Sequence, residues 1–227
     1  MTIRLIPSLG GGGGSEQLVY TDNFQEPNNN FGAGNGTSHP WAASRTQSAA
    51  NVNFFRILGN QLEWIFVQGT GDHQIMFYPL KGGPLGGRNH LSRIVIAADT
   101  GGGPVINRYG PSVLMTGAIT NEHAFYYISV MKDLTNSYAV VRVVNGVETT
   151  LVTSSSNVYG AFPVTLELGQ IVNPGNVQLT VKTNGVVTDV FTDTDVTRPV
   201  AGVPGIFGKF GSAGVHALIS QYVCAPA

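Results

Sequence analysis

Two Asn-Gly dipeptides, each between two runs of β-branched residues, constrain this chain more than any other feature of its sequence. Asn145-Gly146 divides residues 138–152, and Asn184-Gly185 divides residues 177–191. A type I′ turn requires a positive φ at both central residues, and Asn-Gly is a pair that adopts it readily. The pattern therefore predicts two hairpins, each closed by a two-residue turn.

The second hairpin has the clearer separation of faces. A two-residue turn would pair Leu179 with Val190 and Val181 with Thr188, so that alternate residues share a face. The apolar face is predicted to hold Val177, Leu179, Val181, Val186 and Val190, and the polar face Gln178, Thr180, Lys182 and Asp189. This pattern is typical of an antiparallel sheet with one wet side. Because a lone hairpin is marginal in water, both hairpins need further strands beside them.

Short runs of β-branched and aromatic residues, separated by turn residues, continue through the rest of the chain. They predict strands at 18–24, 52–58, 61–67, 73–80, 91–98, 113–119, 124–131, 162–172, 205–210 and 215–223. No run sustains a helical period, and the total is about twelve to fourteen strands. Regular turns between short strands predict an all-β fold, a two-sheet antiparallel sandwich of the jelly-roll kind.

The N-terminal segment differs from the rest. Residues 1–15 are predicted to form an extended arm with a glycine tether, and residues 16–227 the sandwich domain. Residues 2–6 alternate as in a short strand, and Gly10 to Gly14 form a flexible hinge. We expect the arm to dock on a partner chain, with a disordered tail as the alternative. The apolar residues that would dock are Ile3, Leu5, Ile6 and Leu9.

Composition narrows the classes of partner. Charged residues make up 11% of the chain, against about 25% in typical domains, and the net charge is −1. With no Lys/Arg cluster, the sequence argues against nucleic acid or a membrane as main partners. Cys224 is the only cysteine, so no internal disulfide can form. The N-terminus has no long apolar region like that of a signal peptide, so we expect synthesis in a cytosol, or removal of a signal.

Several short motifs resemble the opening of concanavalin A-like lectin/glucanase (LamG-like) jelly-roll domains. These are Asp22-Asn23-Phe24, Trp41 after a loop, and Ile-Leu-Gly-Asn-Gln-Leu at residues 57–62. Residues 126–130, both Asn-Gly-Val hairpins and Gly205-Ile206-Phe207 fit the same template. The resemblance covers roughly residues 18–223. It implies a sandwich whose first and last strands pair side by side.

Domains similar to this occur in many phage structural proteins. A virion component assembles inside the host cytoplasm and needs no signal peptide, which fits the low charge, the absence of disulfides and the tethered arm. We therefore expect a non-enzymatic phage virion protein, decorating a head or associated with a tail. It would be anchored to other virion proteins through its arm, and would form a homo-oligomer. The alternative is a carbohydrate-binding module or receptor-binding protein that attaches to cell-surface glycans.

The acidic residues do not match a glycosidase. The glucanase branch of the family carries a motif resembling Glu-x-Asp-x-x-Glu, and no such triplet occurs in this chain. A retaining mechanism needs two carboxylates about 5 Å apart. The nearest acidic pair is Asp193 and Asp195, which could share one face of a strand but more readily belong to a solvated turn before Pro199. We therefore predict no catalytic residues.

Ligand binding would rest on a different set of residues. Sugar binding needs aromatic faces with amide, hydroxyl or charged groups nearby, and the candidates in or beside predicted loops are Trp41, Tyr78, Asn107, Arg108 and Tyr109. The alternative for each aromatic is that it packs the sandwich. Lectin-like sandwiches often use calcium, so the resemblance also raises a calcium site. Asp22, or Asp193 with Asp195, would supply its hard oxygen ligands.

Overall fold

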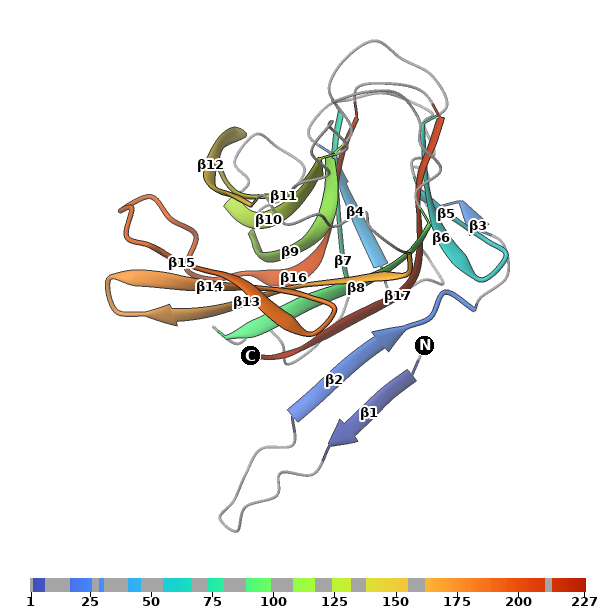
Figure 1. Ribbon diagram of the computed structural model, residues 1–227, viewed down its shortest axis with the longest axis horizontal. Helices are drawn as coiled ribbons and strands as arrows, with labels where there is room; N and C mark the ends of the chain where they lie inside the picture. Colours follow the sequence, from blue (N-terminus) through green and yellow to red (C-terminus); the bar gives the residue numbers. More distant parts are fainter. Residues whose placement is uncertain are drawn as a thin grey trace.

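The computed structural model describes residues 2–6, 17–25, 29–30, 41–45, 55–66, 73–79, 89–98, 108–116, 124–131, 138–154, 162–210 and 214–227. These residues form two antiparallel β-sheets that face each other as a sandwich (Figure 1). The predicted fold class, an all-β two-sheet sandwich, is confirmed. Within these ranges, no helix is long and apolar enough to cross a membrane.

Among the described residues, the larger sheet has ten strands and the smaller has seven. The ten-stranded sheet runs in the order β15-β14-β13-β8-β17-β6-β5-β3, with β2 also beside β17 and β1 beside β2. Its strands are β1 (Thr2–Ile6), β2 (Gln17–Asp22), β3 (Asn29–Asn30), β5 (Phe55–Leu58), β6 (Gln61–Phe66), β8 (His90–Ala98), β13 (Val164–Asn173), β14 (Asn176–Thr183), β15 (Val186–Asp193) and β17 (Gly214–Pro226).

The seven-stranded sheet runs in the order β12-β11-β10-β9-β16-β7-β4. Its strands are β4 (Trp41–Arg45), β7 (His73–Pro79), β9 (Arg108–Thr116), β10 (Ala124–Met131), β11 (Tyr138–Val144), β12 (Val147–Ser154) and β16 (Val203–Phe210). The bounds of β10 are those that the sequence predicts.

The Asn-Gly turns have the predicted conformation. Asn145 and Gly146 have φ of 51° and 77°, and Asn184 and Gly185 have φ of 50° and 80°. Both central residues of each turn are therefore left-handed, as a type I′ turn requires. These turns close the β11–β12 and β14–β15 hairpins.

The predicted register of the β14–β15 hairpin is wrong beyond its first two pairs. Val181 lies opposite Asp189 rather than Thr188, because the register shifts between Val181 and Lys182. A β-bulge adds one residue to β15, and one extra residue moves every later side chain to the other face. As a result Val190, predicted to face the core, is 57% exposed. Val186, also predicted to face inward, is exposed beside the turn.

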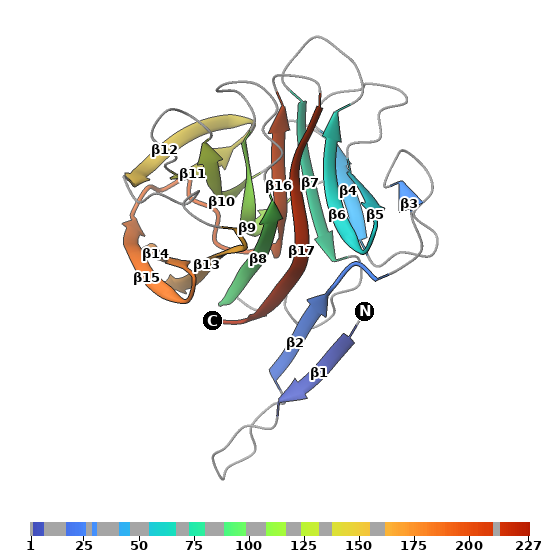
Figure 2. The same ribbon diagram turned by 45° about the vertical axis from the view of Figure 1, so that its right-hand side comes forward.

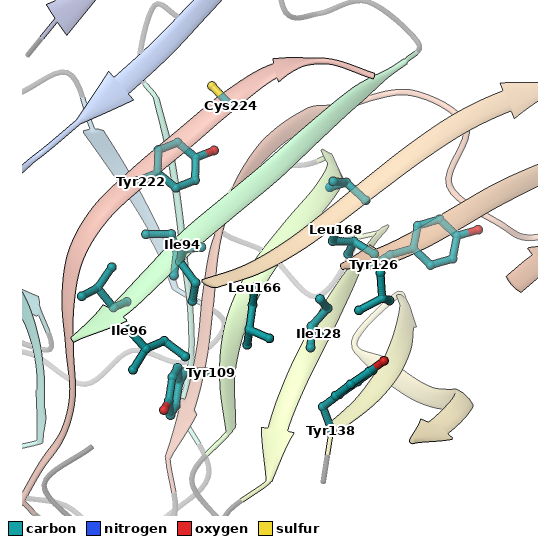
Figure 3. Close-up of a cluster of buried hydrophobic side chains, with 14 of the residues drawn as sticks. Ile94, Ile96, Tyr109, Tyr126, Ile128, Tyr138, Leu166, Leu168, Tyr222 and Cys224 are labelled. Atoms are coloured by element: carbon teal, nitrogen blue, oxygen red, sulfur yellow. The ribbon is translucent and has the colours of Figure 1, made fainter. Parts of the chain in front are cut away.

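The main core lies between the two sheets. Buried side chains of β8, β13 and β17 face buried side chains of β9, β10 and β11 (Figure 3). The fully buried tyrosines Tyr126, Tyr138 and Tyr222 are among the largest side chains in it. Burial alternates strictly along β8 from His90 to Ile96, as expected for a strand with one face in the core.

The seven-stranded sheet is buried on its other face as well. Alternate residues of β10 and β11 form a second apolar cluster with residues of β9 and β16. Its members are Met115, Phe125, Tyr127, Ala139, Val141, Val143 and Phe207. The rings of Tyr127 and Phe207 lie 3.9 Å apart between centroids. The aromatic run at 125–128 is therefore buried throughout and does not form an exposed apolar strip.

The first and last strands of the sandwich body lie side by side, as the family resemblance implies. β2 pairs with β17 through Asp22–Tyr222, Thr21–Val223 and Tyr20–Cys224. β1 is the short strand predicted at residues 2–6, and it pairs antiparallel with β2. Figures 1 and 2 show these two strands extending away from the body of the sandwich.

Candidate functional site

Trp41 and Tyr78 lie on neighbouring strands at one edge of the seven-stranded sheet. The sequence places Trp41 in or beside a loop, whereas it begins β4, the terminal strand of this sheet. The β4–β7 register pairs Trp41 with Pro79 and Ala42 with Tyr78. Trp41 and Tyr78 are therefore one register step apart. Positions one step apart lie on opposite faces of a sheet, so this pairing does not bring the two aromatic residues to one face.

Arg108 and Tyr109 belong to a different part of the same sheet. Both lie in β9, which begins five residues before the predicted strand at 113–119. β16 separates β9 from β7, so Arg108 and Tyr109 are not brought next to Trp41 or Tyr78. Tyr109 is only 2% exposed and belongs to the main core, which fits the alternative reading of this aromatic. Asn107 lies outside the described residues.

A buried charged cluster joins the two sheets where β15 faces β10 and β11. Arg142 of β11 directs Nη1 to both carboxylate oxygens of Asp193, each at 3.0 Å. Its Nη2 lies 2.9 Å from Oδ2 of Asp195. Tyr126 of β10 donates its hydroxyl to Oδ2 of Asp193 at 2.8 Å. The side chains of Arg142 and Asp193 are only 10% and 4% exposed.

The turn after β15 completes this cluster. The backbone N–H and the hydroxyl of Thr197 both donate to Oδ1 of Asp195, at 2.8 Å and 2.7 Å. The backbone N–H of Asp195 in turn donates to Oδ1 of Asp193 at 3.0 Å. These bonds from Thr197, with the guanidinium of Arg142, lower the pKa of Asp195 to about 2.

Tyr126 is the neutral donor of the cluster. Its burial raises the pKa of the phenol well above the usual value. The hydrogen bond to Asp193 and the negative charge of Asp193 raise the pKa of Tyr126 further. The phenol therefore stays protonated and can donate to Asp193 at any physiological pH.

This geometry defines what Asp193 and Asp195 can do chemically. A general acid must carry a proton near neutral pH, and the low pKa of Asp195 keeps that carboxyl ionised. Both carboxylates are turned to the same guanidinium. The pair is therefore a structural anchor between sheets, and it does not offer the free carboxylates of a glycosidase.

The same contacts do not fit a calcium site at Asp193 and Asp195. Calcium needs several oxygen ligands around one point, and here the cation between the two carboxylates is Arg142. Asp22 is fully buried, and its Oδ1 accepts the backbone N–H of Phe24 at 2.8 Å. Among the described residues there is no group of three or more His, Cys, Asp or Glu side chains that could hold a metal ion.

A second polar contact between the sheets lies nearer the β14–β15 turn. The hydroxyl of Tyr138 in β11 donates a hydrogen bond to Oδ2 of Asp189. The same hydroxyl oxygen lies 2.7 Å from Oγ1 of Thr188. The bulge in β15 produces this contact, because it turns Asp189 from the predicted polar face to the core face. Sequence reasoning missed both Arg142 and Tyr138, because each lies about fifty residues from its partners and no local pattern links them.

Comparison with known proteins identifies the fold. No protein-family model matches the chain, and no curated protein matches its sequence. Solved structures do match: the carbohydrate recognition domain of Emp46p has a TM-score of 0.55 and 7% identity, covering 82% of this chain and 87% of that one. A Bacillus licheniformis β-glucanase has a TM-score of 0.54 and 11% identity, covering 92% and 98%.

A phage protein is also among the similar structures. The CBM2 module of the evolved Dit of Lactobacillus casei BL23 phage J-1 has a TM-score of 0.53 and 9% identity, covering 92% of this chain and 96% of that one. The Emp46p domain has been solved in metal-free and potassium-bound forms. At these identities the comparisons show the fold alone, a lectin-like jelly-roll sandwich that occurs both in lectins and in glycoside hydrolases.

Proposed function

We propose that this chain is a non-catalytic carbohydrate-binding sandwich that recognises cell-surface glycans. The observation that carries the proposal is the position of Trp41, which begins β4, the terminal strand of the seven-stranded sheet among the described strands. Sugars bind proteins through aromatic side chains and a few polar groups, so an aromatic residue at a sheet edge suits such a site. Structural likeness to a carbohydrate recognition domain and to a phage CBM2 module supports it.

We propose a non-catalytic protein because its acidic residues do not match those of a glycosidase. The closest acidic pair in the sequence is engaged by Arg142. The chain also lacks the spaced acids of the glucanase motif, although its fold resembles a glucanase. A fold common to lectins and hydrolases takes its activity from its side chains, and these side chains favour binding over hydrolysis.

Replacing Trp41 with alanine should weaken glycan binding by roughly 30-fold, which corresponds to about 2 kcal/mol, the loss typical of a central aromatic contact. The ligand would first be found on a broad glycan array, with and without calcium, and its affinity then measured by calorimetry. Tyr78→Ala should weaken binding much less, because its register position lies on the opposite face of the sheet from that of Trp41.

Trp64 provides a matched control for this experiment. It is the second of the two tryptophans and lies in β6 of the other sheet, so Trp64→Phe should leave the affinity unchanged. In that background Trp41 is the only indole, and its fluorescence should change when the glycan binds. A blank array with a folded protein, or equal losses from Trp41→Ala and Trp64→Phe, would contradict the proposal.

A second function, compatible with the first, is that of a virion protein anchored through its N-terminal arm to other virion proteins. The observation that favours it is the β1–β2 ribbon, which extends from the sandwich (Figure 1). β1 carries alternating apolar residues, among them Ile3 and Leu5. Structural likeness to a module of a phage Dit protein supports a phage setting, with assembly in the host cytoplasm.

Deleting residues 1–15 should abolish incorporation of the chain into particles while the sandwich remains folded. The measurement is the amount of chain in purified particles, beside the thermal unfolding of the isolated protein. A milder variant, Ile3→Ser with Leu5→Ser, should lower incorporation in the same direction. Normal incorporation of the deleted chain would rule out the arm as the anchor.

A further inference from the structure

β15 is a terminal strand with an unusually apolar surface. It ends the ten-stranded sheet and pairs with β14 alone among the described strands (Figure 1). Val186, Val187 and Val190 are 66%, 52% and 57% exposed, although valine is most often buried in folded proteins. Edge strands of this kind are templates for pairing with another strand, unless charges, proline or bulges protect them. The bulge of β15 lies at Thr188, and the strand from Asp189 to Asp193 pairs regularly with β14.

The charges that could protect this edge are already engaged elsewhere. Asp189 accepts a hydrogen bond from Tyr138, and Asp193 is held by Arg142 and Tyr126 on the opposite sheet. On the neighbouring strand, Lys182 lies opposite Val187, and its ammonium is 2.7 Å from Glu167. The outward side chains of β15 are therefore uncharged, and two copies of the strand would not repel each other.

The backbone of β15 is also in the right orientation for pairing. Residues that flank a two-residue type I′ turn form a hydrogen-bonded pair, which here is Thr183 with Val186. Alternation along β14 makes Val181–Asp189 and Leu179–Phe191 the next such pairs. The N–H and C=O groups of Val190, between these pairs, consequently point away from β14, towards the open edge.

We propose that β15 pairs antiparallel with β15 of a second copy of this chain, about a twofold axis at Val190. This register places Val190 opposite itself, Thr188 opposite Thr192 and Asp189 opposite Phe191. No aspartate then faces another aspartate. The two ten-stranded sheets become one continuous sheet across the dimer, and the twofold closes the assembly at two copies.

A cysteine at position 190 tests both the contact and its register. Directly opposed residues in a hydrogen-bonded pair have Cα atoms about 5.5 Å apart, within the roughly 4.4–6.8 Å that a disulfide spans. Val190→Cys should therefore form a covalent dimer under mild oxidation of the full chain. The native Cys224 does not compete, because it is buried, and burial raises the pKa of its thiol to about 12.

Val196→Cys is the matched control. Val196 is 92% exposed and lies beyond the end of β15, so random collisions would oxidise a thiol there at least as fast. We expect the Val190→Cys chain to be crosslinked at least tenfold faster. Equal rates for the two cysteines would overturn the proposal.

Sedimentation velocity of the unmodified chain gives an independent test. It should show a dimer at high protein concentration, and Val190→Lys should convert it to a monomer by placing two lysines face to face. Val196→Lys, with the same added charge, should leave the dimer intact. A wild-type chain that stays monomeric at every concentration, or a series of larger oligomers, would overturn the proposal.

Discussion

Replacing Arg142 with methionine is expected to lower the free energy of unfolding by about 3–5 kcal/mol, because it leaves a buried carboxylate without its partner. Methionine keeps most of the length of the side chain but not the charge. Asp193, only 4% exposed, would then retain Tyr126 but lose both guanidinium contacts. Chemical denaturation at neutral pH, followed by circular dichroism, measures the loss.

Three comparisons make this result specific to the buried ion pair. Arg142→Met combined with Asp193→Asn should recover most of the stability, because no buried charge is then left alone. Arg93→Ala should lower the free energy of unfolding by less than about 1 kcal/mol, because the side chain of Arg93 is 38% exposed and Glu167 retains its ion pair with Lys182. Asp195→Asn should cost less than the loss of Arg142, because Asp195 is more exposed than Asp193. Equal losses for Arg142→Met and Arg93→Ala would show that the cluster contributes no special stability.

Gly110→Ala is expected to destabilise the sandwich by more than about 3 kcal/mol and to lower its soluble yield. A Cβ on Gly110 would collide with the carbonyl oxygen of Ile128 and lie 2.9 Å from its carbonyl carbon. Both atoms belong to the backbone of the adjacent strand, so no side-chain rotation can relieve the collision. The two central strands β9 and β10 would have to separate.

Gly169→Ala is the control for that substitution. Gly169 also lies within a strand, but a Cβ there would meet its nearest neighbours at 3.9 Å, an ordinary van der Waals distance. The change should leave the stability unaltered or raise it by about 0.5–1 kcal/mol, since alanine loses less conformational freedom than glycine. The melting temperatures of the two variants should be compared by thermal unfolding, and Gly110→Ala should melt well below Gly169→Ala. Similar melting temperatures would contradict this account of Gly110.

Local sequence patterns were enough to predict the hairpins and most strands. Asn-Gly turns and β-branched runs act over a few residues, so their conformations follow from the residues themselves. The start of β9 could not be predicted in this way, because Gly110 and Pro111 both argue against an interior strand. Pro111 is nevertheless paired with Ile206 in the middle of the sheet. The sequence places Trp41 in or beside a loop for a similar reason, since β4 is short and flanked by polar residues.

The bulge in β15 marks the limit of prediction for the charged cluster. If side chains alternated regularly from the Asn-Gly turn, Asp189 would face solvent. The one extra residue of the bulge turns Asp189 to the core face instead. The sequence indicates Asp193 with Asp195 as calcium ligands or as part of a solvated turn, whereas in the structure both carboxylates contact Arg142. It could not identify Arg142, because contacts between two sheets depend on how the sheets pack and leave no trace in residue spacing.

The position of β17 has a consequence for how this chain reaches its native state. β17 lies between β8 on one side and β6 and β2 on the other, although it follows all three in sequence. During synthesis, the two parts of the large sheet therefore emerge from the ribosome long before the strand that joins them. Strands that pair over such long separations close slowly, since a long loop must be ordered first. Completion of the sheet thus awaits the final segment of this sequence, and until then the edges of β8 and β6 remain open to other chains.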